Sequence, residues 1–140
     1  DGATSCADPL GGVWQIPGEL APSGEPRRYH ALDLGNTLEL YPMFDDGLID
    51  ATDRKLTTPT AIVAAPAAID LTRRGDALVG TISRRFVRAD RVCVVRAPAR
   101  VSGCRADRAV LEAALLPPPT DWATCAAAPT AARWPVVRTP

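Results

Sequence analysis

The chain has 140 residues, of which 46% are hydrophobic and 23% are charged, and its formal net charge at pH 7 is zero. These are ordinary globular values, which argue against a disordered chain, and the length suits one domain with a real core. No apolar run approaches the roughly 20 residues that a helix needs to cross a bilayer. We therefore expect a single domain over residues 1–140 without a transmembrane segment.

The cysteines are the most informative residues, and there are four of them: Cys6, Cys93, Cys104 and Cys125. An even count in a short chain, without close pairs such as Cys-x-x-Cys, is typical of a disulfide framework rather than a zinc site. Disulfides persist in oxidising compartments, so we expect an exported protein: secreted, periplasmic or at the cell surface. Among the three connectivities, the eleven-residue spacing favours Cys93–Cys104 across a hairpin, which leaves Cys6–Cys125 to tie the two ends together.

The first half of the chain has short apolar segments separated by Gly, Pro and Asp, a rhythm typical of antiparallel β-structure. A first strand is expected at 12–16. Alternating runs at 28–34 and 37–41 flank a Gly-Asn pair, which predicts a hairpin. The aspartate-rich stretch 45–59 is expected to be a long loop, and short strands should follow it as far as residue 72.

The second half begins with a turn at 74–76 and a long predicted strand at 77–87, whose hairpin partner is expected at 91–96. Pro98 should interrupt this partner before a further strand at 99–104. The segment 106–116 is left open, because its Ala, Leu and Glu content favours a short helix while the surrounding rhythm favours a strand. The Pro- and Ala-rich residues 117–140 are expected to form a tail packed on the surface.

These elements predict an all-β fold: a single antiparallel β-barrel or sandwich of about 7–9 strands, with its β core within residues 12–116 and with disulfides as staples. The core should contain the apolar members of the alternating runs. They are Trp14, Ile16, Leu32, Leu34, Leu38, Leu40, Ile62, Ile69, Leu71, Leu78, Ile82, Phe86, Val92 and Val94.

The charge is segregated along the chain. Residues 1–72 carry four basic and eleven acidic side chains, whereas residues 73–108 carry ten arginines and three aspartates. Either acidic and basic strands pair across the sheet, or the basic stretch offers a face to an anionic partner. The residues of such a face would be Arg84, Arg85, Arg88, Arg91 and Arg96. The partner classes are an anionic glycan, a lipid head group or an acidic protein; nucleic acid is not expected, because Phe86 is the lone aromatic residue there.

Enzyme signatures are missing from the sequence. There is no Gly-x-Ser-x-Gly, no His-Glu-x-x-His and no glycine-rich phosphate loop followed by Lys. The single histidine, His30, lies within an alternating run and is expected to have a structural or surface role. The acidic stretch 45–53 lacks the ligand spacing of a calcium loop. We therefore expect no enzyme, no bound metal and no cofactor.

A family resemblance is carried by Gly12-Val13-Trp14 in the first expected strand. Such a Gly-x-Trp, followed by a β meander with disulfides in an exported chain of this size, resembles the lipocalin-like barrels (calycins). The resemblance implies an up-and-down barrel whose interior can hold one small apolar ligand. It also implies that Gly12 and Trp14 close one end of the barrel.

The function that we expect from the sequence is therefore a non-catalytic, exported binding or interaction protein. Two alternatives remain open: a lipocalin-like carrier of a small apolar ligand, and a subunit of an extracellular surface assembly. The expected partner is another protein or a second copy of the chain, because opposite charge on the two halves suits head-to-tail contacts. The many arginines, alanines and prolines favour a bacterial source with a GC-rich genome.

Overall fold

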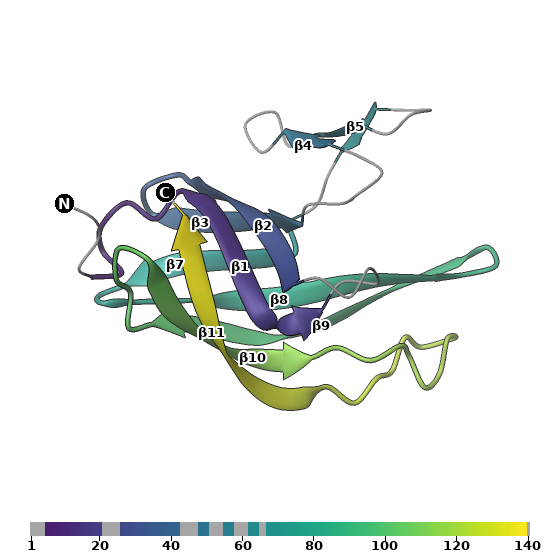
Figure 1. Cartoon of the computed structure of the whole chain (residues 1–140). Coiled ribbons are helices and arrows are strands. Elements are labelled where there is room, and N and C mark those ends of the chain that lie inside the picture. Colours follow the sequence, from purple (N-terminus) through teal and green to yellow (C-terminus); the bar gives the residue numbers. More distant parts are fainter. Residues whose placement is uncertain are drawn as a thin grey trace.

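The computed structural model describes residues 5–20, 26–42, 48–50, 55–57, 62–64 and 67–139, and all the regular structure within them is β-strand. The strands are β1 (Gly12–Leu20), β2 (Pro26–Asp33), β3 (Thr37–Pro42), β4 (Leu48–Asp50), β5 (Lys55–Thr57), β6 (Ile62–Ala64), β7 (Ile69–Arg74), β8 (Ala77–Arg88), β9 (Arg91–Ser102), β10 (Arg108–Leu115) and β11 (Thr130–Thr139). Figure 1 shows these strands along the chain.

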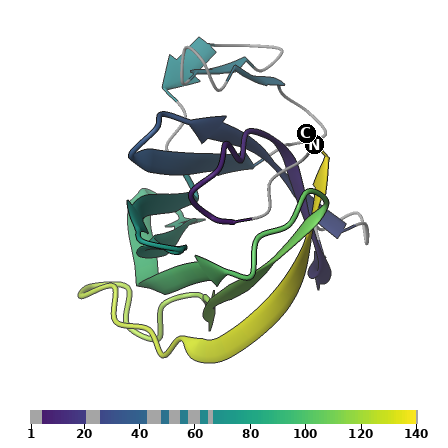
Figure 2. The ribbon, with the colours of Figure 1, turned by 90° about the vertical axis from the view of Figure 1, so that its left-hand side faces the viewer.

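Eight of the strands form a closed antiparallel barrel in the order β1-β2-β3-β7-β8-β9-β10-β11 (Figure 2). Each strand pairs with its neighbour along the order, and β11 pairs back onto β1 through Trp14 opposite Arg138. The short strands β4, β5 and β6 form a separate three-stranded sheet, inserted in sequence between β3 and β7. The expectation of a loop throughout 45–59 was therefore wrong at β4 and β5, which pair with each other. The prediction of a single antiparallel, disulfide-linked β-fold is confirmed, and the barrel is the form that it takes.

Two tight turns between barrel strands use glycine where the backbone needs a positive φ. Gly35 has a φ of 89°, and beside it the Leu34 amide donates a 2.9 Å hydrogen bond to the carbonyl of Thr37, which closes the β2–β3 hairpin. Gly75 has a φ of 62° between β7 and β8. Because residues with a Cβ rarely adopt this conformation, glycine fixes both turns and hence the strand order. Both turns lie where the sequence predicts them.

The core is one cluster of buried side chains that includes residues from all eight barrel strands. Most of the expected core residues belong to it, but Leu32 and Phe86 are only partly buried, and Leu34, Val92 and Val94 are exposed. The prediction was wrong for the two valines because side chains alternate along a strand, and β9 turns Cys93 and Val95 inward. Ile62 lies in β6, whose side chains fall outside the described residues.

The C-terminal third of the chain differs from its prediction in two respects. The segment 106–116 contains strand β10 and no helix; its pairing with β9 on one edge and β11 on the other outweighs its helical propensity. Residues 117–140 are not only a surface tail, because β11 supplies the strand that closes the barrel and buries Trp134 and Val136. The β core therefore extends from residue 12 to residue 139.

The disulfides join Cys6 to Cys104 and Cys93 to Cys125, so the predicted connectivity was wrong. Its error was the break expected at Pro98, because β9 runs without interruption from Arg91 to Ser102. The nine residue steps of continuous strand from Cys93 to Ser102 span about 30 Å, so Cys104, two residues further on, lies far beyond disulfide reach of Cys93. The two cysteines therefore serve opposite ends of the barrel. Two disulfides are consistent with an oxidising compartment.

Candidate functional site

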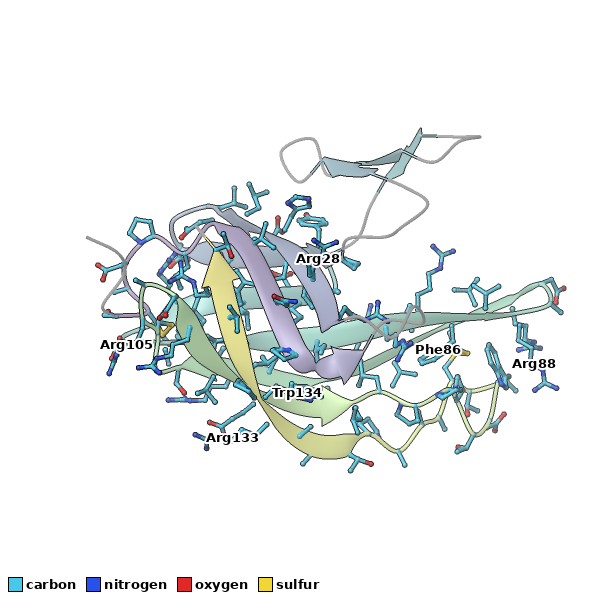
Figure 3. All side chains as sticks on the ribbon, in the orientation of Figure 1. Arg28, Phe86, Arg88, Arg105, Arg133 and Trp134 are labelled. Carbon is cyan, nitrogen blue, oxygen red and sulfur yellow. A yellow bond between two sulfur atoms is a disulfide. The ribbon has the colours of Figure 1, made fainter. Side chains whose placement is uncertain are left out.

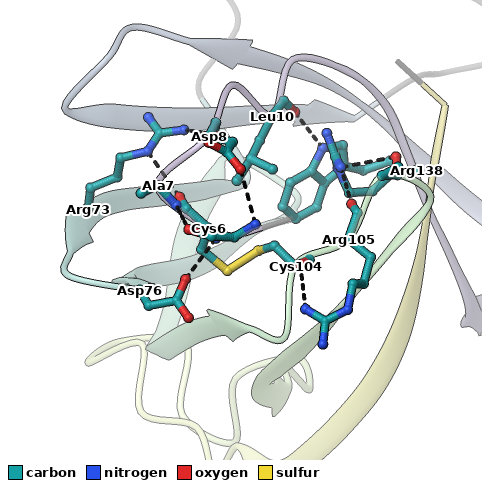
Figure 4. The surroundings of a disulfide bond; sticks show 12 residues. Cys6, Ala7, Asp8, Leu10, Arg73, Asp76, Cys104, Arg105 and Arg138 are labelled. Atoms are coloured by element: carbon teal, nitrogen blue, oxygen red, sulfur yellow. Dashed lines mark hydrogen bonds between the residues drawn. A yellow bond between two sulfur atoms is a disulfide. The ribbon is translucent and has the colours of Figure 1, made fainter. Parts of the chain in front are cut away.

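One end of the barrel is covered by the N-terminal segment 5–11, which lies across it in Figure 2. Cys6 is bonded to Cys104, and its backbone amide donates a 3.0 Å hydrogen bond to a carboxylate oxygen of Asp76 (Figure 4). Leu10, fully buried, accepts a 2.9 Å hydrogen bond at its carbonyl from Nε1 of Trp14. We call this end, with segment 5–11 and the Cys6–Cys104 disulfide, the sealed end.

Arg73 fastens the N-terminal segment to the β2–β3 turn. Its Nε donates to the Cys6 carbonyl at 3.1 Å, and Nη2 donates to the Asp8 carbonyl at 2.8 Å. Both Nη atoms donate to the Asp33 carboxylate, at 2.9 and 2.8 Å, and Nη1 also donates to the Gly35 carbonyl. All five N–H groups of this guanidinium are thus used. The hydrogen bond from Arg73 is the main reason that the pKa of Asp33 falls from 3.8 to about 2.

A second arginine, Arg138, lies within the sealed end. It is only 4% exposed, and its guanidinium carbon lies 5.9 Å from the centre of the Trp14 ring, a cation–π distance. Its Nη1 donates to the carbonyls of Arg105 and Ala106 (Figure 4). Burial lowers the pKa of Arg138. Trp14 is therefore held between a carbonyl on its ring nitrogen and a cation on its face.

The opposite end of the barrel carries a projecting arm, which we define as residues 83–96 of β8 and β9. Up to Ile82, β8 pairs with both β7 and β9, but beyond that residue the ladder joins β8 to β9 alone, as far as Arg88 opposite Arg91. Six residue pairs correspond to a reach of roughly 20 Å. Figure 1 shows this hairpin extending well beyond the other strands of the barrel.

The segment 117–129 lies against one face of the arm, which we call the inner face. Cys93 on this face is bonded to Cys125. The guanidinium carbon of Arg88 lies 5.8 Å from the centre of the Trp122 ring, and Nη1 of Arg91 donates to the Trp122 carbonyl at 3.4 Å. A disulfide and an aromatic contact thus fix the arm to the loop beside it, and Figure 3 shows Arg88 near the tip.

The five arginines predicted to form one anion-binding face are divided between two faces. Arg84, Arg88 and Arg91 share the inner face, whereas Arg85 and Arg96 lie on the opposite, outer face. The division follows from the two-residue period of a strand. In the β8–β9 ladder, partners of these arginines are Ser83, Val94, Val95 or another arginine, so the predicted pairing of basic with acidic strands is not made there.

The outer face also carries a group of exposed valines that sequence reasoning missed. Val87 is 65% exposed, Val92 46% and Val94 39%. Val87 lies opposite Val92, and Arg85 lies opposite Val94, so the valines and Arg85 adjoin one another in the ladder. The sequence signal that could have revealed these valines is Cys93. Its bond to Cys125 turns its side chain toward the 117–129 segment, and because side chains alternate along a strand, the flanking Val92 and Val94 must point to the opposite face.

The remaining sequence candidates do not assemble a reaction centre. His30 is partly exposed on β2, opposite Val13 and Tyr41, between Tyr29 and Ala31, which face the core. Within the described ranges, no group of three or more His, Cys, Asp or Glu side chains is arranged to hold a metal ion. Most of the acidic stretch 45–53 lies outside the described residues.

Comparison with known proteins identifies no relative: no family model, no curated protein and no solved structure matches the chain. Among the residues that the structure describes, none form a helix long and apolar enough to span a membrane.

Proposed function

We propose that this chain is a non-catalytic, exported binding protein that contacts its partner through the outer face of the arm. The observation that carries the proposal is the position of the exposed apolar residues. Six large apolar side chains in the described part of the chain are exposed, and three of them, Val87, Val92 and Val94, are neighbours on this one face. Clustered exposed apolar side chains are typical of interaction surfaces, whereas single ones are ordinary.

The arm is also held ready for binding. Its inner face is fixed to the 117–129 segment by the Cys93–Cys125 disulfide and by the Arg88–Trp122 contact. A surface that is already ordered loses less conformational entropy when its partner binds. The arm can therefore contribute its apolar area to binding without first having to fold.

The experiment that tests this proposal is site-specific photo-crosslinking in the cells that produce the protein. A photoreactive residue at Val87 should give a discrete crosslinked product. The matched control is Leu34, an apolar side chain that is 47% exposed beside the β2–β3 turn at the sealed end. Equal products from both positions, or none from Val87, would contradict the assignment of the partner surface to the arm.

A second candidate function, a lipocalin-like carrier of a small apolar ligand, is favoured by the closure of one barrel end around Trp14. Eight meandering strands, a Gly12-x-Trp14 in the first of them and one sealed end agree with what that resemblance implies. Native mass spectrometry of the protein from its own source separates the candidates. A bound small molecule supports the carrier, and a ligand-free oligomer favours the subunit of a surface assembly.

A further inference from the structure

We infer that the outer face of the arm docks onto an anionic lipid bilayer. The inference rests on the proposed function and names the partner class of that same surface. Three features lead to it: the net charge of the arm, the apolar side chains among the arginines, and the distance that the arm projects from the barrel.

The arm is strongly cationic and its charge is not neutralised within the ladder. Residues 83–96 include five arginines and one acidic residue, Asp90, which gives a net charge of +4 (five minus one). Two arginines outside the arm are engaged differently: Arg73 pairs with Asp33, and Arg138 is buried. An anionic leaflet attracts such a cluster, and each arginine near the surface raises binding about fivefold.

The exposed valines distinguish a bilayer from a purely acidic surface. Val87, Val92 and Val94 share the outer face with Arg85 and Arg96. At a membrane interface, cationic heads lie among the phosphates while aliphatic groups reach the boundary with the acyl chains. An acidic polar partner would bind the arginines but would leave the aliphatic group in contact with water.

The length of the arm allows its tip to reach the boundary between head groups and acyl chains. The arm extends roughly 20 Å beyond the last barrel pairing, whereas interfacial insertion requires about 5–10 Å. The tip can therefore enter the head-group layer while the barrel remains in water. The Cys93–Cys125 disulfide holds the 117–129 segment against the inner face of the arm, so the outer face is the one presented to the lipid.

The main test is sedimentation of the whole protein with vesicles of phosphatidylglycerol and phosphatidylcholine in equal parts, and with vesicles of phosphatidylcholine alone. We expect binding to the anionic vesicles only, and weaker binding as salt shortens the reach of the charges. R85Q/R96Q should weaken binding about 25-fold, fivefold for each arginine. The control R74Q/R133Q removes two exposed arginines outside the arm and should leave binding within about twofold of the native value, because these lie away from the lipid.

The valines are tested separately. V87S/V92S should weaken binding about tenfold or more, because it removes apolar area without changing charge. L34S is the matched control at the sealed end. A Val87→Trp variant adds a direct readout: its fluorescence should shift to shorter wavelength with anionic vesicles, while that of Leu34→Trp should not. Circular dichroism of each variant establishes that it is folded.

Several results would overturn the inference. These are equal binding to both kinds of vesicle, no binding to either, or binding that neither double variant weakens. Self-association in the absence of lipid, abolished by V87S/V92S, would assign the surface to a second copy instead. If vesicles do not bind but Val87 still crosslinks to a protein, the bilayer inference fails and the proposed function stands. If the Val87 crosslink is also absent, both fail.

Discussion

The two ends of the barrel contain the same two kinds of interaction, a disulfide and an arginine–tryptophan contact, but these have different roles at each end. Each has a disulfide, and each has an arginine over a tryptophan ring: Arg138 over Trp14 at the sealed end, and Arg88 over Trp122 on the arm. At the sealed end the arginine is 4% exposed and the contact is part of the core. On the arm the arginine is exposed, and its contact with Trp122 holds the 117–129 segment against the inner face. Burial, rather than the kind of contact, decides whether the pair stabilises the core or only anchors a loop.

The disulfides give the largest expected effect. Cys6 and Cys104 are 98 residues apart and Cys93 and Cys125 are 32 apart. In the chain-entropy model these separations are worth about 4.7 and about 3.7 kcal/mol. C6A/C104A should therefore lower the free energy of unfolding more than C93A/C125A does, as measured by denaturant titration. If C93A/C125A lowered the free energy of unfolding more than C6A/C104A does, the sealed end would not be the end that contributes more to the stability of the fold.

The buried arginine provides the next test. Arg138→Ala leaves the carbonyls of Arg105 and Ala106 without their donor and uncovers the Trp14 ring. We expect a loss of about 3 kcal/mol in unfolding free energy, within the range for orphaned buried polar groups with lost packing. Thermal unfolding measures it, and near-ultraviolet circular dichroism should show a changed environment of Trp14. Substitutions at exposed sites usually change the unfolding free energy by less than about 0.5 kcal/mol. A loss below that value for Arg138→Ala would therefore contradict a structural role for Arg138.

The ion pair at the sealed end predicts a dependence of stability on pH. Because the pKa of Asp33 is about 2 in the folded protein and 3.8 ordinarily, its contribution is complete above about pH 5. It is then lost progressively as the pH falls from about 5 to about 1. We expect this loss to be about 1–2 kcal/mol, reduced by solvent screening of a partly exposed pair. Denaturant titrations at several pH values should show a flatter acid limb for Asp33→Asn than for the native protein.

The local parts of the fold could be predicted from the sequence, and the long-range parts could not. The β2–β3 and β7–β8 hairpins are encoded by Gly35 and Gly75, at turns that need a positive φ. The break predicted at Pro98 was wrong, because proline is usual at the ends of strands but here lies within one. Its missing N–H is tolerated since β9 is paired with β10 only over residues 100–102 and has β8 as its one ladder neighbour at Pro98.

The same contrast holds for the candidate site. The arginines of the arm were visible as a cluster in sequence, but their division between two faces depends on strand alternation fixed by Cys93. The role of β11 was hidden because closing a barrel depends on pairing between Trp14 and Arg138, 124 positions apart, and no local pattern encodes such a contact. Residue type therefore located the charge, whereas long-range pairing and the disulfides determined what surrounds it.

The smallest expected effect lies at the arginine–tryptophan contact of the arm, and it sharpens the comparison most. Arg88→Ala should lower the free energy of unfolding by about 0.5–1 kcal/mol, as for an exposed cation–π pair. That loss is far below the one expected for Arg138→Ala, although the two pairs have nearly equal separations of 5.8 and 5.9 Å. If Arg88→Ala and Arg138→Ala were equally destabilising, burial could not be what separates the two ends, and the arm would be as much a part of the core as the sealed end.

Trp122→Ala should have a similarly small effect on the free energy of unfolding. It should nevertheless increase proteolytic cleavage within 117–129, because the loop loses an anchor to the arm.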